Sequence, residues 1–399
     1  MSRFSKPGHG SEAGPIDVTL AATLIGLIAF GVVMVYSASA VYANNMFGNG
    51  THFLVRQTVF ALVALVILFV CAHANIDLLR RSTYPVLLIA VLLMIAVALG
   101  FGRSAGGATR WLALGPVNVQ PAELAKLAMI LWLAHSLAKK SHRVQTFSIG
   151  FLPHVLVAGL LMLLCLAQPD FGSAVMIALL TFVVLFAAGA KAGYLLGCVL
   201  IALPVGYAAI ASSPYRMRRI KAFLEPFEHR QGAGYQITES LMSFGSGGWT
   251  GVGLGDGRQK LLFLPEAHTD FISAIIGEEL GFIGVILLSA AFAWIVFRGL
   301  RAAWRAQDDY AGYLAAGMTL FIGLQAFTNL AVAMGLLPTK GLALPFVSYG
   351  GSSLLVNAAA AGIILNTSRF GVSRTEQPPA KVKPSRRQPK LQTARGGAR

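Results

Sequence analysis

Long apolar runs recur along most of this chain, and they constrain its fold more than any other feature of the sequence. A transmembrane helix needs roughly 20 mostly apolar residues, within a range of about 17–25. We identify ten runs of this kind, at residues 16–37, 53–72, 84–101, 121–138, 150–167, 173–190, 194–212, 271–297, 311–336 and 351–369. The sequence therefore predicts an all-α polytopic membrane protein with about ten transmembrane helices.

Composition supports this fold class and excludes an ordinary soluble domain. The 399 residues are 56% hydrophobic and 12% charged, with a mean hydropathy of +0.67, whereas soluble domains have roughly 25% charged residues. Alternating strands of about ten residues, which would indicate a transmembrane barrel, are absent. Cys71, Cys165 and Cys198 all fall within predicted spans. We expect them to be small packing residues and not a disulfide or a metal site.

The net charge of +16 is explained by membrane topology and does not indicate a nucleic-acid partner. Lys and Arg gather after spans two, four, six and eight and near both termini, as the positive-inside rule expects of cytoplasmic segments. We therefore expect residues 1–15 to be a cytoplasmic segment and residues 16–370 to be the membrane domain. Residues 371–399 should form a disordered basic cytoplasmic tail. The first run lacks a clear cleavage site, so we expect no cleavable signal peptide.

The same topology places five loops on the outer side of the membrane. These are residues 39–52, 102–120, 168–172, 213–270 and 337–350. The loop between spans seven and eight is by far the longest, and loops of this size more often have a function than serve only as a connection. Within it, Tyr215–Phe227 mixes basic and apolar residues, so it could lie on the membrane interface or hold an anionic pyrophosphate lipid. The glycine-rich Gly245–Gly257 matches no phosphate-binding fingerprint, and we expect a flexible loop with unusual backbone angles.

Asp270 stands at the outer end of span eight, where charge is expensive. Partial desolvation raises the pKa of a carboxyl group toward the range of a general base. A second segment, Leu337–Ser353, closes another loop on the same side, so we expect a reaction centre at this membrane face. The alternative is a helix N-cap, because Asp before an apolar run is a favoured cap residue. Spacing alone does not decide between these roles, which are compatible.

Two pairs of charged residues lie inside predicted spans. Adjacent carboxylates such as Glu278 and Glu279 cannot both face lipid at low cost, so at least one should face the bundle interior and pair with Lys or Arg, or stay protonated. Glu123 and Lys126 are spaced to pair on one helix face. An internal salt bridge is the simpler interpretation of this second pair. A headgroup cavity or a proton path is the alternative.

Two outward loops carry further polar candidates. Arg110 offers the forked donors that match phosphate oxygens, whereas Trp111 alone could be an interfacial anchor. Asp170 lies in a Pro/Gly turn, where a local hydrogen-bonding role is the simpler reading. No His/Cys/Glu cluster has zinc spacing, and no GxSxG nucleophile elbow is present.

Several long segments, in one order along the chain, resemble the SEDS family of cell-wall membrane proteins, named for shape, elongation, division and sporulation. The resemblance runs from span three to span ten. Leu264–Phe271, after Arg258-Gln259-Lys260, is most similar to the division (FtsW) branch, with a RodA-like elongation protein as the alternative. The matching segments are Arg110-Trp111, Gln120–Lys126, Gln168–Gly172, Leu264–Phe271 with Gly277–Gly281, and Pro338–Gly341 with Leu344–Ser353.

The resemblance implies a peptidoglycan glycosyltransferase that polymerises lipid II, a disaccharide-pentapeptide on undecaprenyl pyrophosphate, by inverting transfer. It places the reaction at the outer face of the bacterial cytoplasmic (inner) membrane, at the division septum. Asp270 would be the catalytic base. A divalent cation (Mg²⁺ or Mn²⁺) could stabilise the pyrophosphate, but its ligands are unknown. The residues expected at the substrate are Arg110, Trp111, Glu123, Lys126, Asp170, His268, Lys340 and Ser348, with Glu278 and Glu279 as a structural polar core.

The resemblance also implies partners. The chain lacks the SxxK, SDN and KTG set of a transpeptidase, so crosslinking would come from a class B penicillin-binding protein, together with other divisome proteins. Two other functions stay open. One is a lipid II flippase, which needs a polar route that Glu123, Lys126, Glu278 and Glu279 could partly line. The other is a non-catalytic divisome scaffold. Charge is sparse in spans one to three and five to seven, which favours surface chemistry over passage through the membrane.

Overall fold

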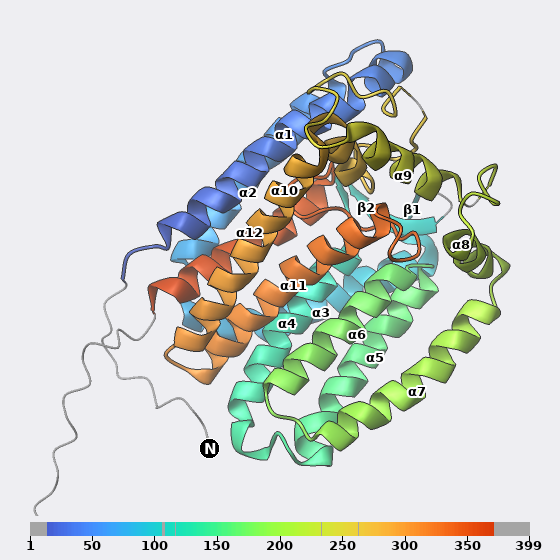
Figure 1. The fold of residues 1–399 in the computed structure, drawn as a ribbon. Helices are drawn as coiled ribbons and strands as arrows, with labels where there is room; N and C mark the ends of the chain where they lie inside the picture. Colours follow the sequence, from blue (N-terminus) through green and yellow to red (C-terminus); the bar gives the residue numbers. More distant parts are fainter. Residues whose placement is uncertain (1–13, 106–107, 116, 233, 262, 371–399) are drawn as a thin grey trace, which may run out of the picture.

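In the described part of the chain, ten long helices lie side by side and form one bundle (Figure 1). The computed structural model describes residues 14–105, 108–115, 117–232, 234–261 and 263–370. Each predicted span coincides with one of these helices, so the all-α membrane fold is confirmed. The long helices are α1 (Val18–Phe47), α2 (His52–His73), α3 (Ile76–Ala96), α4 (Pro121–Lys139), α5 (Leu152–Ala167), α6 (Phe171–Ala187), α7 (Ala192–Ala211), α10 (Ile272–Arg305), α11 (Asp309–Ala333) and α12 (Gly351–Arg369).

Not all of these helices are equally apolar. Among the described residues, seven helices are long and apolar enough to cross a membrane: α1, α2, α3, α5, α7, α10 and α11. Helix α6 is apolar but has 17 residues. Helices α4 and α12 contain charged, polar or small residues, and they bury most of their side chains inside the bundle, which is where a membrane protein tolerates polar groups. The exact number of crossings stays a prediction.

Three of the predicted outer loops contain substantial regular structure. The prediction of a loop at residues 39–52 is largely wrong, because α1 continues to Phe47 and ends on Gly48, whose left-handed backbone (φ 68°) is a common helix stop. The predicted loop 102–120 holds a small antiparallel sheet in the order β1-β2-β3. Its strands are too short and too irregular in sequence to show the alternation of apolar and polar residues that indicates a strand. Its strands are β1 (Arg103–Ala105), β2 (Ala108–Leu114) and β3 (Val117–Val119).

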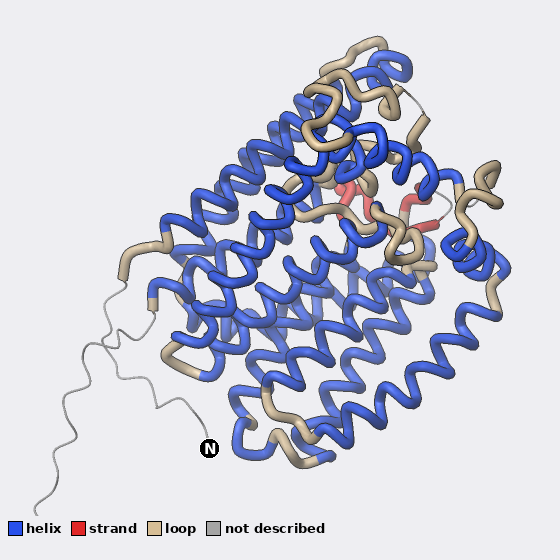
Figure 2. Tube along the Cα trace, viewed as in Figure 1, coloured by secondary structure: helices blue, strands red, loops and turns tan. Residues whose placement is uncertain are grey.

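The elements outside the long bundle gather at one end. The long predicted loop folds into α8 (Pro214–Leu224) and α9 (Tyr235–Gly247). Figure 2 shows the strands, α8, α9 and much of the irregular chain at this end of the bundle. Short helical turns occur at η1 (Val97–Phe101), η2 (Ser141–Arg143) and η3 (Phe147–Phe151). Because the polar segments gather here, this end is where a site outside the membrane core can form.

The two ends of the described chain meet at the opposite end of the bundle (Figure 1). The backbone N–H of Gly14 donates to the carbonyl of Arg369 at 2.9 Å. Nearby, Arg298 of α10 forms an ion pair with Asp17, which also caps α1. A chain with both termini on one side of the membrane crosses it an even number of times, which agrees with the prediction of ten spans. The predicted tail, 371–399, and most of the predicted N-terminal segment lie outside the described residues.

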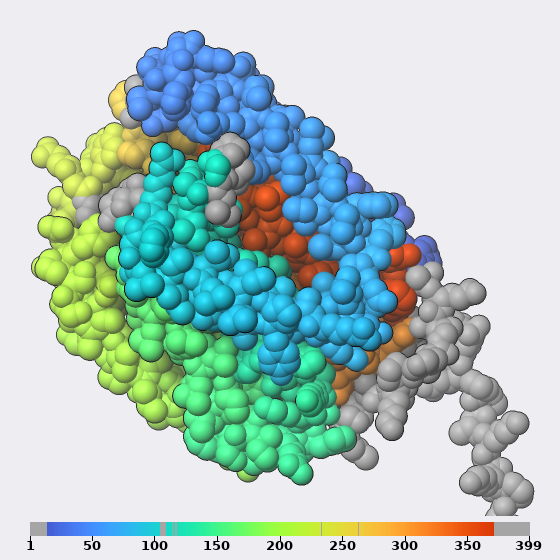
Figure 3. Space-filling model, turned by 180° about the vertical axis from the view of Figure 1, so that it is seen from behind, coloured from blue at the N-terminus to red at the C-terminus, as the bar shows by residue number. Residues whose placement is uncertain are grey.

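Burial differs sharply between the helices. Helices α4, α11 and α12 form the centre, whereas α7 lies at the edge and is almost wholly exposed (Figure 1). Helices α2 and α12 pack closely, and a Cβ at Gly362 would lie 2.5 Å from the Leu68 carbonyl oxygen, so this contact requires glycine. Seen from behind, the surface is hollowed between α2 and α3, where α12 comes into view (Figure 3).

Candidate functional site

Asp270 lies in a turn that leads into α10. The segment Leu264–Phe271, here called the Asp270 segment, reverses at Glu266, which has a positive φ of 57°. The backbone N–H groups of Thr269 and Phe271 both donate to the Glu266 carbonyl, at 3.1 and 3.3 Å. The N-cap position of α10 belongs to Phe271 and carries no side-chain cap bond. The alternative interpretation of Asp270 as an N-cap is therefore wrong.

The Asp270 carboxylate faces a second segment of the chain. A Cβ added to Gly341 would lie 3.2 Å from Asp270 Oδ2, so this glycine allows a close approach. Residues 337–350, here called the Lys340 segment, thus form one wall beside the carboxylate. Among the described residues no side chain or backbone N–H donates a hydrogen bond to the carboxylate, although Asn329 bonds the Asp270 backbone. The carboxylate oxygens are therefore available to a substrate.

Electrostatics at this position suit a general base. Part of the Asp270 side chain stays accessible, but protein atoms enclose most of the carboxyl group. This burial raises the pKa of Asp270 to about 7, and the negative charge of Glu266 adds to the rise. The guanidinium groups of Arg219 and Arg110 oppose it. A base is most effective when its pKa is close to the working pH, so a carboxyl group with this pKa can accept a proton near neutrality.

Three cations approach the site from different elements. Arg110 on β2 donates from Nε to the Gln168 carbonyl at 3.4 Å, and its Nη2 donates to the Pro169 carbonyl. Arg219 on α8 donates from Nη1 to the Thr339 carbonyl at 3.0 Å. Lys340 is the next residue in the chain after Thr339. Burial lowers the pKa of its ammonium group, and the negative charge of Asp170 acts in the opposite direction and raises it. Each guanidinium keeps donors that these bonds do not use.

His268 and Ser348 stabilise the two segments. The His268 ring lies 4.7 Å from the Phe53 ring and 5.7 Å from the Tyr349 ring, and burial lowers its pKa. The Tyr349 N–H donates to the His268 carbonyl at 2.9 Å. Ser348 Oγ accepts from the Leu344 N–H at 2.8 Å. These contacts fix the Asp270 and Lys340 segments against each other, and a substrate role for either residue stays a prediction.

Asp170 has the local role that its turn suggested. It is the N-cap of α6, where Oδ1 accepts from the Ser173 N–H at 3.1 Å and Oδ2 from the Ser173 hydroxyl at 2.8 Å. The Gln120 amide donates to Oδ2 at 3.2 Å. Trp111 pairs with Arg103 across the β1–β2 ladder. Neither Asp170 nor Trp111 contacts Asp270 in the described residues, and their substrate roles stay predictions.

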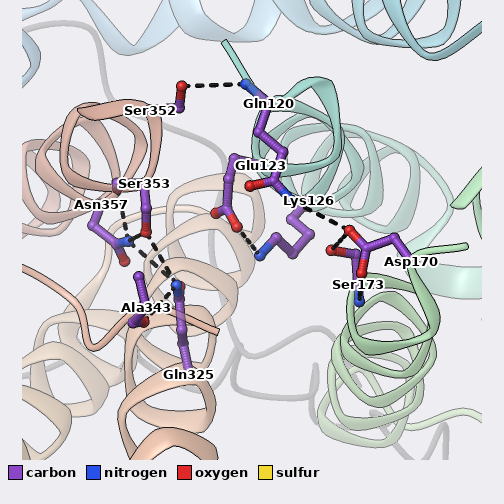
Figure 4. A network of polar contacts seen from close by, with 10 residues as sticks. All are labelled: Gln120, Glu123, Lys126, Asp170, Ser173, Gln325, Ala343, Ser352, Ser353 and Asn357. Atoms are coloured by element: carbon purple, nitrogen blue, oxygen red, sulfur yellow. Dashed lines mark hydrogen bonds and ion pairs between the residues drawn. The ribbon is translucent and has the colours of Figure 1, made fainter. Parts of the chain in front are cut away.

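Glu123 and Lys126 form the internal salt bridge that their spacing predicted. Lys126 Nζ lies 2.7 Å from Glu123 Oε1, and both side chains are buried on α4. Figure 4 shows this pair facing a polar cluster from α11 and α12. There, the Gln325 amide donates to the Ala343 carbonyl and to Ser353 Oγ, at 3.1 and 3.2 Å. The cluster lies inside the bundle, and Asp270 does not belong to it.

Glu278 and Glu279 anchor the glycine-rich segment onto α10. Glu279 pairs with Lys260 at 2.7 Å, which confirms that one of these carboxylates meets a cation. It also accepts from the Ser37 hydroxyl at 2.7 Å. Glu278 accepts from the Arg258 N–H at 2.7 Å. Both carboxylates are thus used within the fold, as a structural polar core requires.

The prediction that Gly245–Gly257 is a flexible loop is wrong in one respect. Its backbone angles are unusual as expected, with φ of 82° at Gly251. The segment is, however, bonded to α10, which is broken at Gly281 (φ 66°). The Phe282 N–H donates to the Gly248 carbonyl at 2.9 Å, and the Val252 N–H donates to the Glu278 carbonyl at 3.0 Å. Backbone groups released by the helix break are satisfied by the glycine-rich segment, which is therefore held in place.

Two residues of the site were not singled out from the sequence, although Arg219 lies in the basic segment Tyr215–Phe227. Asn329 on α11 bonds the backbone of both segments, and Arg219 reaches the Lys340 segment from α8. An amide inside an apolar span was the available signal for Asn329. For Arg219 the signal was the helical spacing of the basic residues in Tyr215–Phe227. In the described residues, no group of three or more His, Cys, Asp or Glu side chains could hold a metal ion.

Two apolar cavities in the described part of the chain are separate from this site. One, of about 330 Å³, is lined by residues of α9, α10 and the end of α11, including Leu241, Phe244 and Phe282. The other, of about 460 Å³, lies between α10 and α11 and is lined by Phe292 and Phe327 among others. Neither has a titratable side chain in its lining. They suit apolar contacts and carry no reaction chemistry.

Comparison with known proteins points to one family. The profile of a family described as cell cycle protein, covering FtsW, RodA and SpoVE, matches residues 18–372. A probable peptidoglycan glycosyltransferase FtsW of Trichlorobacter lovleyi is 46% identical over 353 residues, covering 88% of this chain and 93% of that protein. A protein of the same name in Alkalilimnicola ehrlichii is 41% identical over 377 residues, covering 93% and 94%.

Two solved structures share the fold. A chain from "Structural coordination of polymerization and crosslinking by a peptidoglycan synthase complex" is 28% identical, with a TM-score of 0.74, and the match covers 89% of this chain and 98% of that one. The rod shape determining protein RodA of Thermus thermophilus is also 28% identical, with a TM-score of 0.66, and the match covers 90% and 98%. The sequence and structure comparisons agree over nearly the whole chain.

Proposed function

We propose, because this chain belongs to the cell cycle protein family of FtsW, RodA and SpoVE, that it is a peptidoglycan glycosyltransferase of cell division and that Asp270 is its general base. The relatives named FtsW are 41–46% identical to it, whereas the RodA structure is 28% identical, which favours the division branch over the elongation branch. The observation that carries the assignment of Asp270 is a carboxylate that accepts no hydrogen bond from the described residues and whose pKa is raised to about 7.

The proposed reaction joins two molecules of lipid II or adds one to a growing strand. Asp270 removes the proton from the acceptor sugar hydroxyl as the hydroxyl oxygen attacks the anomeric carbon of the donor. The bond from that carbon to undecaprenyl pyrophosphate breaks, the pyrophosphate takes the electron pair, and the anomeric configuration inverts. Asp270 then releases its proton to water. Because pyrophosphate is a good leaving group, a second carboxylic acid is less necessary here than in glycoside hydrolysis.

In this proposal, Arg110, Arg219 and Lys340 stabilise the pyrophosphate. They come from β2, α8 and the Lys340 segment, and both guanidinium groups act electrostatically on Asp270. Guanidinium forks match phosphate oxygens, and fixed cations at a leaving group stabilise the charge that develops there. We place the reaction at the outer face of the cytoplasmic membrane, at the septum, with both termini in the cytoplasm.

A crosslinking partner belongs to the same proposal. One structural relative comes from a peptidoglycan synthase complex that couples polymerization and crosslinking. By analogy, we propose that a class B penicillin-binding protein crosslinks the strands that this chain makes. The flippase alternative finds less support, because the charged groups that would line a route are used inside the protein: Glu123 with Lys126, and Glu279 with Lys260.

The test is polymer formation from labelled lipid II. Purified full-length protein would be incubated with its cognate penicillin-binding protein, the transpeptidase being blocked, and glycan polymer would be separated on a gel. We expect polymer from the wild type and from Asp256→Asn, which changes an exposed aspartate of the same outer region, but none from Asp270→Asn. Polymer from Asp270→Asn would refute the role of Asp270. If no variant makes polymer and lipid II crosses liposomes instead, the protein is a flippase.

A further inference from the structure

Asn329 joins the two segments of the site from inside the bundle. It is buried on α11, and its Nδ2 donates one hydrogen bond to the Asp270 carbonyl at 2.8 Å and one to the Leu342 carbonyl at 2.7 Å. Its Oδ1 accepts from the Ser273 hydroxyl at 3.2 Å. The Asp270 and Leu342 carbonyls determine which way the amide faces, because a carbonyl can only accept a hydrogen bond. The two N–H bonds of this one side chain are thus donated to the Asp270 segment and to the Lys340 segment, which are distant in sequence.

This contact matters because the Asp270 carboxylate has no bond that would hold it. With no donor to the carboxylate in the described residues, its position follows from its backbone. Asn329 holds that backbone at Asp270 itself. It also holds Leu342, two residues after Lys340. A change in the amide would therefore move the carboxylate relative to the Lys340 segment.

The second tie between the segments lies further from the reacting group. It is the bond from the Tyr349 N–H to the His268 carbonyl, at 2.9 Å. With this bond in place, the segments should stay paired even when Asn329 is changed. Loss of the amide would then shift Asp270 locally and leave the fold intact, because His268 remains packed against Phe53 and Tyr349. Effects of about 100-fold on rate follow from displacements of about 1 Å at a reacting group.

We propose that Asn329 is a positioning residue that fixes the distance between the Asp270 carboxylate and the Lys340 segment. The inference rests on the proposed function, since it assigns to Asp270 the role of base. Asn329 touches no substrate; it acts through the two carbonyls that it binds.

The chain contains a matched control for this arrangement. Asn366 on α12 is equally buried, and its Nδ2 donates to the Cys71 and Ala74 carbonyls at 3.0 and 2.6 Å. It lies at the opposite end of the bundle, near the paired Gly14 and Arg369. Changing either asparagine to aspartate keeps the shape and removes both donors when the carboxyl is ionised, or one of them when it is protonated. Asn329→Asp and Asn366→Asp should therefore perturb stability alike and differ in catalysis.

The experiment compares these two variants with the wild type in the labelled lipid II assay, with the cognate penicillin-binding protein present. We expect Asn329→Asp to lower kcat at least tenfold, with KM within threefold, and Asn366→Asp to keep kcat within threefold. Thermal unfolding in detergent should be lowered similarly in both. Ser273→Ala is a milder second variant that removes the hydroxyl bonded to the amide, and we expect it to lower kcat about threefold.

Three outcomes separate the possible errors. If the wild type polymerises and Asn329→Asp matches Asn366→Asp in kcat, the positioning role is refuted while the proposed function stands. If Asn329→Asp fails to fold and Ser273→Ala keeps wild-type kcat, the positioning role is also refuted. If the wild type makes no polymer that depends on Asp270, the proposed function itself fails.

Discussion

The strongest prediction concerns the pH dependence of the reaction. A base must be ionised to accept a proton, and the pKa of Asp270 is raised to about 7. With this pKa, about half of the molecules carry an ionised Asp270 at pH 7, about one in ten at pH 6 and about one in a hundred at pH 5. The rate should therefore fall about fivefold from pH 7 to pH 6 and about tenfold from pH 6 to pH 5, provided that proton transfer limits the rate.

Two neighbouring substitutions should move this profile in opposite directions. Glu266 raises the pKa of Asp270, so Glu266→Gln should lower it and extend activity to more acidic pH. Arg219 lowers the pKa, so Arg219→Gln should raise it and narrow the active range. The assay is initial polymerisation rate on labelled lipid II from pH 5 to 9, with Asp256→Asn as the control. A wild-type profile that stays flat down to pH 5, or shifts of the same sign in both variants, would refute the assignment.

Three further predictions concern stability, each measured by thermal unfolding of the full-length protein in detergent. Lys260→Met leaves Glu279 buried without its cation, and loss of one partner of a buried pair costs about 3–5 kcal/mol; an unchanged unfolding temperature would contradict the described pairing. Gly281→Ala should destabilise the protein by at least about 1 kcal/mol, because φ is 66° and a Cβ would lie 2.3 Å from the Gly251 nitrogen; Gly159→Ala, where a Cβ meets nothing within 4 Å, is the control. Asp270→Asn should stabilise the protein at pH 8, because folding raises the pKa above its unfolded value and so disfavours the ionised form. That stabilisation should fade as pH falls through about 7 toward 4, and a loss of stability at pH 8 would contradict it.

The helices of this fold are readable from the sequence because each leaves a local signal. An apolar run of span length can only be a helix in a bilayer, since each backbone group must be satisfied within its own segment. All ten predicted runs are helical for this reason. The ends are less readable: α1 continues to Phe47 through residues that are polar enough to resemble a loop. The three short strands between α3 and α4 have no alternating pattern long enough to detect.

The site is readable only in part, for a related reason. Asp270 was detectable because a carboxylate at a span end is unusual on its own, and the Glu123–Lys126 bridge because its spacing is local. The role of Asn329 depends on a contact with a residue 59 positions away, which no local pattern reveals. The glycine-rich segment appeared flexible for the same reason, since its partners on α10 come later in the chain.

We propose that Asp270 performs the chemical step and does not merely hold the substrate. The most direct test is a single-turnover measurement with saturating labelled lipid II and the cognate penicillin-binding protein, comparing wild type with Asp270→Asn. General-base catalysis contributes about 10²–10⁴-fold, so we expect Asp270→Asn to lose that much in the rate of glycosidic bond formation, with lipid II binding unchanged within a few-fold. A rate within tenfold of the wild type, or a loss explained entirely by weaker binding, would contradict it.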